Sequence, residues 1–547
     1  MNQIEGALKC AMSRAIKEAF DLNYSEEQVI IEIPKDKSHG DYACNSAMQL
    51  TRQLHRNPRQ IAQDVMAHFD LEAAGVASYE IAGPGFINFT MQSASLTGVI
   101  ERVWKEQDAY GTNDSGAGIR VNLEYVSANP TGNLHLGHAR GAAWGDSVAR
   151  LMQASGYAVT REYYVNDAGN QIVNLGKSLQ ARYREHLGLP FELPADGYHG
   201  EDVREIAIAL AEENGDRYAQ ESEENLKFFK QQGIAFELAK IRKDLDYYRV
   251  HFDVWSSEQA IRDAGKVEEA LQVLAEKGLT YEKEGALWFA TTRFGDDKDR
   301  VLRKTDGSYT YLVPDIAYHK DKMDRGYDQL VDFFGADHHG YVPRLKASIA
   351  ALGNDPDKLS VDIIQMVRLV ENGQEVKMSK RLGNAVTIRE LCDEVGVDAA
   401  RYFFVQRALE SHLDFDLGLA RSQSNDNPVY YAQYAHARMC SILRSADGYP
   451  QAESYERLTH EKEIELMKYI NEFTSVVAEA ARLRAPHKVC NYIQKLAQKF
   501  HSFYNACKVL DAKDEVLSAQ RLALVQATRI TLKNALTLIG VEAPEKM

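Results

Sequence analysis

The alternation of hydrophobic and polar positions divides the chain into three regions. Up to residue 112, amphipathic helical patterns accompany the strand-like runs EQVIIEIP and GPGFINFTM, which predicts an N-terminal α+β domain over residues 1–112. The glycine- and polar-rich stretch YGTNDSGAG that follows is typical of a linker. After Asp426 no strand pattern remains, which predicts a C-terminal all-α helical bundle over residues 426–547.

The middle region, residues 113–425, has the pattern of a parallel α/β domain. The run IRVNLEYVSANP predicts a strand to about Val126, a helix follows from about His138 to Ala154, and YAVTREYYV predicts a second strand. Strand, helix and strand in this order indicate a βαβ unit with a parallel sheet. Residues from about 171 to 285 are charged and mostly helical, and we interpret them as an insertion. Strand-like runs then return at GALWFATTRF, DQLVDFFGAD and SVDIIQMVRLV.

Composition excludes several protein classes. The chain has 547 residues, of which 45% are hydrophobic and 26% charged, as in ordinary globular proteins. No segment approaches the ~20 apolar residues that span a bilayer, so we expect no membrane partner. The first residues, MNQIEGALKCAM, lack the pattern of a secretory signal. The six cysteines are scattered without a C-x-x-C pair, so we expect reduced thiols, no zinc and a cytoplasmic location.

Charge is unevenly distributed along the chain. The formal net charge of −15 alone argues against a nucleic-acid partner. From Asn425 to Met547, however, 16 basic and 14 acidic residues leave a net charge of +2. Ala481 to Leu510 holds six basic residues and no acidic one. This basic stripe favours phosphate binding, although a solvated helix face would give the same pattern.

The segment NPTGNLHLGHARG lies where the first strand of the parallel unit is expected to pass into its helix. Such turns bind nucleotides, because unpaired N–H groups and the helix dipole favour phosphate. Gly132 and Gly137 would let a nucleotide approach the backbone. His135 and His138 place two imidazole donors on one side of the first helical turn, where they would bond phosphoryl oxygens. A metal site is the rival interpretation, but the segment offers no third ligand.

A second motif, EVKMSKRLGN, occupies Glu375 to Asn384. Lys377 and Lys380 enclose Met378 and Ser379 in a stretch flanked by glycines. Two ammonium groups on such a loop would clamp a pyrophosphate leaving group. A lone K-x-x-K is usually solvated surface and a lone H-x-x-H is usually packed or solvated, but the two motifs together are highly specific.

Together, HLGH and KMSKR resemble the two signatures of class I aminoacyl-tRNA synthetases. Longer runs narrow the resemblance to the arginyl-tRNA synthetase family: LEYVSANPTGNLHLGHARG, YYVNDAGNQI, YLVPDIAYHKDK and NPVYYAQYAHARMCSILR. The runs HGDYACNSAM and AGPGFINF extend it to the N-terminal region. The resemblance implies a Rossmann-type catalytic domain with an insertion, an additional N-terminal domain that contacts tRNA, and a helical anticodon-binding domain.

The resemblance also implies an arginine pocket. Glu124, Tyr311 and Asp315 match the positions that hold the guanidinium, and carboxylates suit this planar cation because they pair with it bidentately. Asn129 matches the residue that binds the amino-acid end of the substrate. His338 stands where many family members carry glutamine, and it would contact the α-amino group or the ribose. Without the resemblance, Glu124 is an ordinary strand charge and Asp315 complements a helix dipole.

The implied activity is that of an arginine–tRNA ligase. Arginine's carboxylate attacks the α-phosphorus of ATP, giving arginyl-adenylate and pyrophosphate, and the terminal 2′-OH of tRNA(Arg) then attacks the acyl carbon. His135 and His138 would stabilise the α-phosphate in the transition state, and Lys377 and Lys380 the pyrophosphate. Mg²⁺ would accompany ATP without a dedicated protein cage. The residues expected around ATP are Pro130, Thr131, Gly132, His135, Gly137, His138, Met378 and Ser379.

The basic stripe is expected to lie along the anticodon stem-loop of tRNA. Its proposed contacts are Arg482, Arg484, Lys488, Lys495 and Lys499. The interleaved aromatic residues Tyr492, Phe500, Phe503 and Tyr504 are expected to belong mostly to the core. We expect the protein to act as a monomer.

Three alternatives remain open. A class I synthetase of the cysteinyl type needs a zinc site, which the cysteine and histidine spacing does not build. A nucleotidyltransferase can share H-x-G-H but does not need a long C-terminal helical region. A non-catalytic tRNA-binding paralogue would not need intact histidines and lysines. An ATP–pyrophosphate exchange assay with each amino acid, with and without tRNA, would separate these alternatives.

Overall fold

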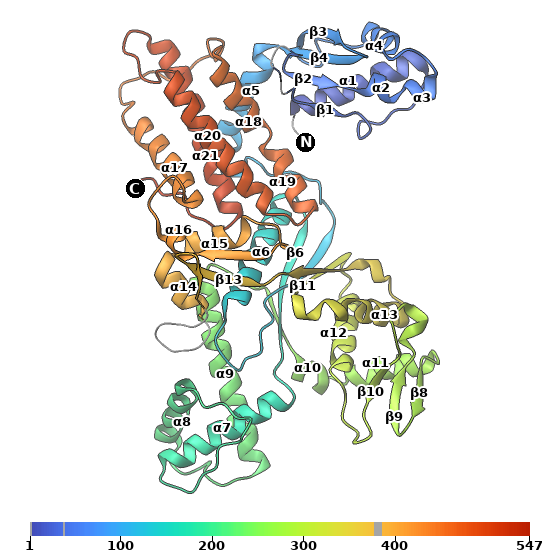
Figure 1. Cartoon of the computed structure of the whole chain (residues 1–547), viewed down its shortest axis with the longest axis vertical. Coiled ribbons are helices and arrows are strands. Elements are labelled where there is room, and N and C mark those ends of the chain that lie inside the picture. Colours follow the sequence, from blue (N-terminus) through green and yellow to red (C-terminus); the bar gives the residue numbers. More distant parts are fainter. Residues whose placement is uncertain (1–2, 35, 37–38, 377–385) are drawn as a thin grey trace. The chain divides into compact units, whose positions relative to one another are not determined.

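The computed structural model describes residues 3–34, 36, 39–376 and 386–547 (Figure 1). The chain divides into two compact units. Unit 1 comprises Met1–Ser115, Gln423–Arg484 and Lys488–Met547, and unit 2 comprises Gly116–Ser422 and Ala485–His487.

Unit 2 is built on a parallel sheet, which confirms the predicted α/β fold class. Among the described residues the strands follow the order β12-β11-β5-β6-β7, and each neighbouring pair is parallel. Chain order reverses between β5 and β11, and open α/β sheets bind ligands at the carboxyl ends of the strands beside such a reversal. The strand bounds are β5 (Arg120–Glu124), β6 (Ala158–Val165), β7 (Val254–Ser257), β11 (Gln329–Gly335) and β12 (Leu359–Ile364).

Helices connect these strands. α6 (Leu136–Ala154) joins β5 to β6 as predicted, α12 (Leu312–Asp324) leads into β11, and α13 (Val342–Leu352) joins β11 to β12. Further helices of unit 2 are α10 (Glu258–Asp263), α11 (Lys266–Glu276), α14 (Ile388–Val395), α15 (Val397–Val405) and α16 (Leu417–Arg421).

The predicted insertion is shorter than the sequence pattern indicated. The helices α7 (Asn170–His186), α8 (Glu201–Asn214) and α9 (Glu223–Tyr247) pack on one another around a core that includes Leu179 and Phe229 (Figure 1). The strand β7, however, lies inside the predicted range 171–285 and pairs in parallel with β6. The predicted end of the insertion at residue 285 is therefore wrong, because this segment supplies an edge strand of the sheet.

Two strand-like runs belong wholly or in part to other sheets. GALWFATTRF contains β9 (Ala286–Phe289), which pairs antiparallel with β8 (Thr280–Lys283) and β10 (Arg300–Arg303). SVDIIQMVRLV divides between β12 and β13 (Val367–Glu371). β13 pairs antiparallel with β14 (Gln374–Glu375) and in parallel with β15 (Leu413–Asp416).

Unit 1 contains the predicted α+β and all-α parts. The antiparallel strands follow the order β1-β2-β4-β3, and α1 (Gln3–Phe20) and α4 (Pro58–Ala67) contribute Leu8, Met12 and Ile61 to the core of this part. The other bounds are β1 (Ile31–Glu32), β2 (Tyr42–Cys44), α2 (Ser46–Gln49), α3 (Thr51–Leu54), β3 (Val76–Ala82), β4 (Phe86–Met91) and α5 (Ser93–Glu106).

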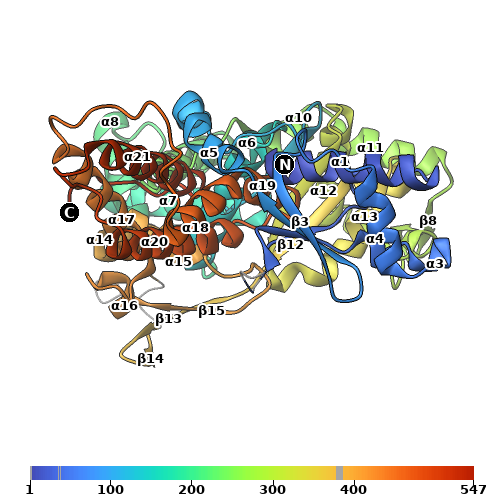
Figure 2. The same cartoon turned by 90° about the horizontal axis from the view of Figure 1, so that it is seen from above.

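The C-terminal helices are α17 (Pro428–Arg444), α18 (Glu461–Asn471), α19 (Phe473–Arg482), α20 (His487–Ala506) and α21 (Glu515–Leu538). α17 runs beside α21 (Figure 2). α4 and α17 each begin at an Asn-Pro pair, in which the Asn57 or Asn427 side chain accepts a backbone N–H and proline fills the first helical position.

A row of buried carboxylates crosses the middle of the parallel sheet. Asp332 of β11, Glu124 of β5 and Glu162 of β6 are register partners on neighbouring strands, and each is at most 5% exposed. Lys322 of α12 lies against the row: its Nζ is 2.8 Å from Asp332 Oδ1 and also bonds Glu124. Arg325 at the end of α12 bonds Glu162 at 2.9 Å. Buried like charges side by side are unfavourable, so these cations are required for the strands to pair.

Replacing Lys322 by methionine should therefore lower the free energy of unfolding by about 3–5 kcal/mol, because methionine keeps the chain length but leaves buried carboxylates unpaired. Urea titration followed by tryptophan fluorescence measures this, since Trp144, Trp255 and Trp288 all lie in unit 2.

Lys320→Met is the matched control. Lys320 lies on the same helix and is 2.7 Å from Glu269 and from Asp324, whose side chains are 56% and 59% exposed. Loss of such surface pairs costs about 1 kcal/mol or less. Equal destabilisation by the two substitutions would contradict the structural role of Lys322.

Candidate active site

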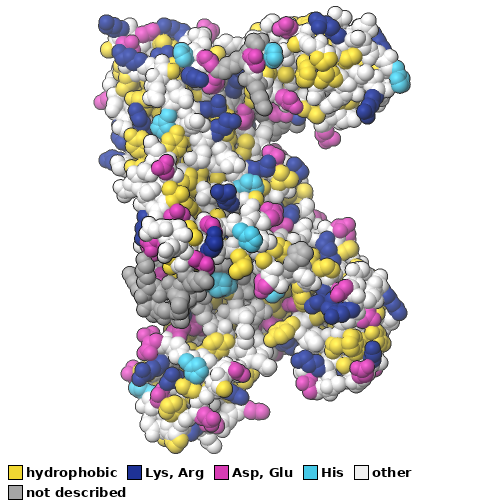
Figure 3. All heavy atoms as spheres, in the orientation of Figure 1, with side chains coloured by type: hydrophobic (Ala, Val, Ile, Leu, Met, Phe, Trp, Pro, Cys, Tyr) yellow, Lys and Arg dark blue, Asp and Glu magenta, His cyan; other side chains and the backbone are white. Residues whose placement is uncertain are grey.

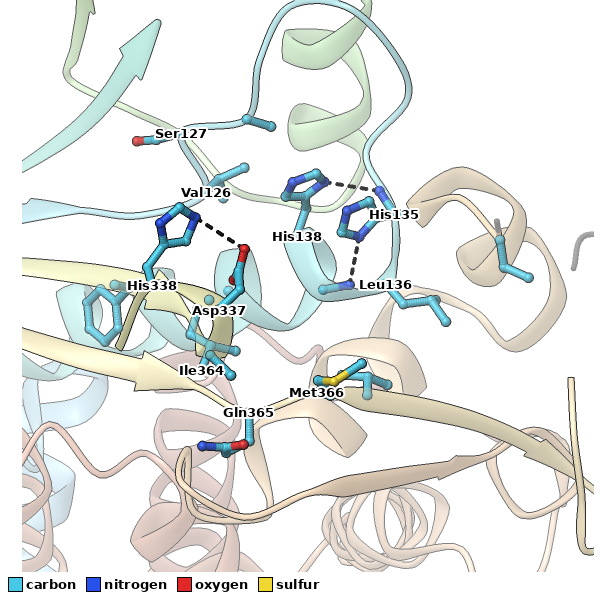
Figure 4. Close-up of a pocket in the computed structure, with 18 of the residues that line it drawn as sticks. Val126, Ser127, His135, Leu136, His138, Asp337, His338, Ile364, Gln365 and Met366 are labelled. Atoms are coloured by element: carbon cyan, nitrogen blue, oxygen red, sulfur yellow. Dashed lines mark hydrogen bonds and ion pairs between the residues drawn. The ribbon is translucent and has the colours of Figure 1, made fainter. Parts of the chain in front are cut away.

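The first turn of α6 fixes the orientation of both predicted histidines. His135 caps the helix: its Nδ1 accepts the backbone N–H of Gly137 at 3.1 Å. The Nδ1 of His138 accepts the backbone N–H of His135 at 3.2 Å. The two rings stack with their centroids 3.8 Å apart (Figure 4). A Cβ atom on Gly137 would lie 3.1 Å from His135 Cε1, so the glycine leaves room for this ring.

These backbone contacts determine the chemistry of the imidazoles. Because Nδ1 accepts a hydrogen bond in each ring, the proton of the neutral ring is on Nε2, which is then a donor. Burial lowers the pKa of His135. Burial, together with the adjacent His135, lowers the pKa of His138 to about 3. The pair is therefore neutral at physiological pH and presents two N–H donors, as required for bonding phosphoryl oxygens.

The histidines line a cavity of about 610 Å³ at the carboxyl end of the parallel strands. Of the predicted site residues, Asn129, His135, Gly137, His138 and His338 belong to its wall. The opposite part of the wall is formed by Ile364, Gln365, Met366 and Val367, where β12 passes into β13 (Figure 4). Pro130, Thr131 and Gly132 do not line this cavity, although they lie in the turn that leads to α6.

The chain enters the cavity through strained backbone. Val126 and Ser127, which begin two residues after the end of β5, have φ angles of 70° and 38°. A β-branched residue in this region is a marked outlier, and such strain persists only where surrounding contacts impose it. Here the Ser127 hydroxyl donates to Glu124 Oε1 at 2.9 Å and accepts the Tyr164 N–H at 3.1 Å. The strand end is thereby held in the conformation that lines the cavity.

Two predicted residues of the cavity wall, Asn129 and His338, have polar neighbours. Asn129 is exposed and its amide donates to Gln171 at 2.8 Å. His338 follows β11, and its Nε2 lies 3.4 Å from Asp337 Oδ2 (Figure 4). Both side chains are therefore accessible from the cavity.

Asp315 lies one helical turn before His319 on α12. Burial raises the pKa of its carboxyl group to about 6, although a hydrogen bond from Tyr341 opposes the shift. Tyr341 was missed by the sequence analysis, and it contacts Asp315 from the segment just before α13. Tyr311, the predicted phenol, is 84% exposed. An incoming cation would relieve the cost of burying the Asp315 carboxylate.

Glu124 lies in the carboxylate row rather than on the cavity wall. Burial raises its pKa, while Lys322 opposes this shift and Asp332 adds to it. Glu124 is also among the groups that raise the pKa of Asp315. The two carboxylates therefore share one electrostatic environment, in which positive charge is favoured.

The second signature lies outside the described residues. Lys377, Met378, Ser379 and Lys380 fall within residues 377–385, so their predicted roles have no structural test here. The described chain approaches them through β14 and Val376, and Val376 lines the cavity.

The basic stripe lies mainly on α20. Lys495 is exposed, and its Nζ lies 5.6 Å from the centroid of the Tyr469 ring. Lys499 is 24% exposed and lies 3.9 Å from Glu465. Lys488 lies 3.1 Å from Glu479, Arg482 is exposed, and Arg484 is half-buried. Acidic neighbours therefore accompany part of the stripe, and Figure 3 likewise shows acidic and basic side chains interspersed on the face it presents.

The aromatic residues of the stripe are mostly core, as predicted. Tyr492, Phe500 and Phe503 are at most 2% exposed. Tyr504 is half-buried, and the Arg438 guanidinium lies 4.5 Å from its ring centroid.

A groove in unit 1 was missed by the sequence analysis. It has a volume of about 730 Å³. α17 contributes Tyr430, Tyr431, Tyr434 and Arg438, and α20 contributes His501. The tyrosines at i and i+4 lie parallel, with centroids 6.3 Å apart. Their spacing in YYAQYAHAR was the available signal, because residues four apart share one helix face.

Metal ions and membranes are the other partners that the sequence analysis addressed. The part of the chain that the structure describes has no group of three or more His, Cys, Asp or Glu side chains placed to hold a metal ion. Within the same residues, none of the helices has the length and hydrophobicity needed to cross a membrane.

Comparison with known proteins gives a consistent result over the chain. Its residues 4–91 match the family described as "Arginyl tRNA synthetase N terminal domain", and residues 100–408 match "tRNA synthetases class I (R), catalytic domain". Residues 432–547 match the "DALR anticodon binding domain".

Individual relatives match at full length. The arginine–tRNA ligase of Bacillus licheniformis is 55% identical over 555 residues, which cover 100% of both chains. That of Bacillus subtilis is 55% identical over 551 residues, or 100% of this chain and 99% of its own. The structure of Thermus thermophilus arginyl-tRNA synthetase has the same fold, with a TM-score of 0.75 at 23% identity over 99% of each chain.

The histidine pair makes a spectroscopic prediction. In the folded protein, His138 should remain neutral with its proton on Nε2 from pH 8 to pH 5, because its pKa is lowered to about 3. Since the unfolded ring titrates near 6.5, the stability contributed by this ring is complete above about pH 6.5 and declines as the pH falls toward 3.

Nitrogen-15 NMR of labelled histidine measures the tautomer directly. The variants His135→Asn and His138→Asn assign the signals, and free histidine in the buffer gives the reference titration. An imidazolium signal of His138 that appears between pH 7 and 6 would rule out the observed pairing.

Proposed function

The chain belongs to the class I arginyl-tRNA synthetases, and from that premise we propose how its residues divide the work of arginine–tRNA ligation. The enzyme activates L-arginine with ATP as arginyl-adenylate and transfers the arginyl group to tRNA(Arg). The observation that carries the assignment of residues is the cavity at the switch point of the parallel sheet. It presents two neutral imidazole donors, while Asp315, half-buried on α12 and not part of the cavity wall, supplies a carboxylate whose pKa is raised.

ATP occupies the cavity with its phosphates at the start of α6. The Nε2–H groups of His135 and His138 donate to the α-phosphate oxygens as charge moves to the leaving group. The turn at Pro130, Thr131 and Gly132 carries the chain past the nucleotide to the helix. Lys377 and Lys380, flanking Met378 and Ser379, neutralise the departing pyrophosphate.

Arginine lies with its guanidinium toward the carboxylates. Asp315 pairs with the guanidinium, and Glu124 adds negative potential from the adjacent strand end. Tyr311 closes over the same group from the start of α12. Asn129 and His338, both accessible from the cavity, bind the amino-acid end and the ribose side of the substrate.

The carboxylate of arginine then attacks the α-phosphorus in line with the departing pyrophosphate. The protein positions both reactants and supplies no covalent nucleophile. The 2′-OH of the terminal adenosine of tRNA attacks the acyl carbon in the second step. Mg²⁺ bound to ATP would supply neutralisation of phosphate charge. Asp337 and Glu375 are carboxylates on the cavity wall that suit a hydrated ion of this kind.

Unit 1 supplies the tRNA contacts outside the catalytic centre. The basic stripe at Arg482, Arg484, Lys488, Lys495 and Lys499 follows phosphates of the anticodon stem-loop, and unstacked bases lie on the tyrosines of the groove on α17. The N-terminal α+β part adds a further tRNA contact.

We also propose domain boundaries, location and assembly. The N-terminal domain covers residues 1–112, the catalytic domain 113–425 and the anticodon-binding domain 426–547. The limits of unit 2 at Gly116 and Ser422 support these boundaries. Five of the six free cysteines are buried, which suits a reducing cytoplasm and a protein without zinc. A monomer suffices, because one chain carries the residues assigned to both steps.

Arginine specificity is the direct test of this assignment. In pyrophosphate exchange with tRNA(Arg) present, arginine should be the amino acid that supports exchange. Asp315→Asn should lower kcat/KM for arginine about tenfold or more, because a charge-assisted bond contributes roughly 1.5–3 kcal/mol. The affinity for ATP should stay unchanged.

The pH dependence provides a sharper measure. With a pKa of about 6, wild-type Asp315 becomes protonated as the pH falls through 6. The advantage of the wild type over Asp315→Asn should therefore be complete above pH 7 and shrink below pH 6. Taking the ratio of the two enzymes cancels the titration of ATP. A ratio of one at every pH would remove Asp315 from the pocket.

The salt dependence of tRNA binding tests the stripe. The double substitution Lys495→Ala with Lys499→Ala should weaken tRNA binding and reduce the log–log salt slope by about one to two units. The reason is that binding releases fewer counterions when phosphate contacts are lost. Lys513→Ala with Lys546→Ala, two exposed lysines outside the stripe, is the control pair. If both double variants keep the wild-type slope, the RNA is held elsewhere.

A further inference from the structure

Arg140 lies two residues after His138 and is 0% exposed. Its guanidinium donates to three backbone carbonyls. Nη1 lies 2.7 Å from the oxygen of Gln365 and 3.0 Å from that of Ser411, and Nη2 lies 2.9 Å from that of Ala408.

Burying a guanidinium group in this way is energetically unfavourable for the stability of the fold. The structure records no ion pair for Arg140 with any residue it describes, and its Nε is buried without a hydrogen-bond partner there. Burial lowers the pKa of Arg140 to about 10, with Glu410 opposing the shift, so the side chain is charged at neutral pH. A buried charge without a counterion is costly, and apolar side chains of similar volume often replace such groups without loss of stability. Fold stability alone therefore does not account for this residue.

The three carbonyls belong to the junction between two sheets. Gln365 lies where the chain leaves β12 and enters β13, while Ala408 and Ser411 form the turn that leads into β15. The same segments are joined by the bonds from Gln365 N–H to Leu409 O and from Leu413 N–H to Met366 O, both 3.2 Å. Arg140 thus connects the histidine helix to the start of the β13–β15 pair.

This junction is also the cavity wall opposite the histidines. Gln365, Met366 and Val367 line the cavity together with His135 and His138. Because Arg140 and His138 share a helical turn, the guanidinium bonds set the spacing between the histidines and this wall.

We propose that Arg140 is a positioning residue for adenylate formation, which holds the wall at residues 365–367 at the correct distance from His135 and His138. The inference rests on the proposed placement of ATP in the cavity. A displacement of about 1 Å in such a site slows the reaction as much as 100-fold while binding contacts persist. Lysine keeps the charge but not the planar fork that bonds carbonyls on separate segments.

The test compares Arg140→Lys with Arg401→Lys. Arg401 is also 0% exposed. It pairs with Asp146 of α6 and donates to the carbonyl of Tyr248 at 3.0 Å. These partners do not line the cavity, so Arg401→Lys reports the effect of losing a buried arginine on the fold alone.

Three quantities are measured at a temperature well below unfolding: the single-turnover rate of arginyl-adenylate formation with tRNA(Arg), the equilibrium Kd for ATP, and the thermal midpoint. Arg140→Lys should reduce the rate about 10- to 100-fold and change the Kd for ATP less than threefold. Arg401→Lys should keep a rate near that of the wild type at a comparable thermal midpoint.

Two outcomes overturn the inference: a wild-type rate in Arg140→Lys, or an equal loss of rate in Arg401→Lys at matched stability. If Arg140→Lys does not fold, Arg140→Gln, which keeps two donors without the charge, is judged by the same criteria. His138→Gln separates the premise from the inference. A wild-type rate in that variant refutes the ATP placement, whereas a slow His138→Gln beside a fast Arg140→Lys refutes only the role of Arg140.

Discussion

The catalytic half of this molecule depends on the ion pairs that the buried ammonium group of Lys322 forms with Glu124 and Asp332. Parallel register brings Asp332, Glu124 and Glu162 side by side on neighbouring strands, and those strands can pair only if positive charge covers the row. Lys322 meets two of the carboxylates and Arg325 the third. This requirement fixes how α12 is rotated against the sheet. The same rotation places Asp315, two turns before Lys322, in contact with Tyr341.

The helix α6 satisfies a second constraint. One short segment must cap the helix, pack against the strand ends and position the two histidines. His135 and His138 satisfy the N–H groups of His135 and Gly137 with their own side chains, which leaves each Nε2–H as a donor. A Cβ on Gly141 would lie 3.0 Å from Ile364 Cδ1, and one on Gly145 would lie 2.3 Å from Tyr125 Cγ. Glycine at these positions lets the helix approach the strand ends. The glycines that follow the histidines on α6 therefore serve close packing.

Local patterns in the sequence predicted those features of the fold that depend on interactions between residues close together in the chain. The βαβ unit, the histidine pair and the helical C-terminal region follow from periodicity and spacing within about 40 residues. Strand β7 was not predicted, because its four residues are all half-buried and give no hydrophobic run. SVDIIQMVRLV was taken as one strand pattern, yet the chain changes sheets at Gln365, where its partners are Arg140 and Leu409. The contact between Tyr341 and Asp315 also joins segments that are distant in the sequence. Neither this contact nor the change of sheet at Gln365 is visible in a local pattern.

The C-terminal part, which matches an anticodon-binding domain, shows how an acidic chain can present positive charge locally. Lys495 and Lys499 lie near Glu472, whose pKa burial raises to about 7 although both lysines oppose the shift. Near neutral pH this carboxyl group is therefore only partly ionised, and it cancels less of the lysines' charge than an exposed glutamate would. A phosphate that engages the lysines weakens their hold on the Glu472 carboxylate and further favours its protonated form. The potential of the stripe would thus become more positive if an anion approached, so the proposed phosphate contacts are compatible with the nearby Glu472.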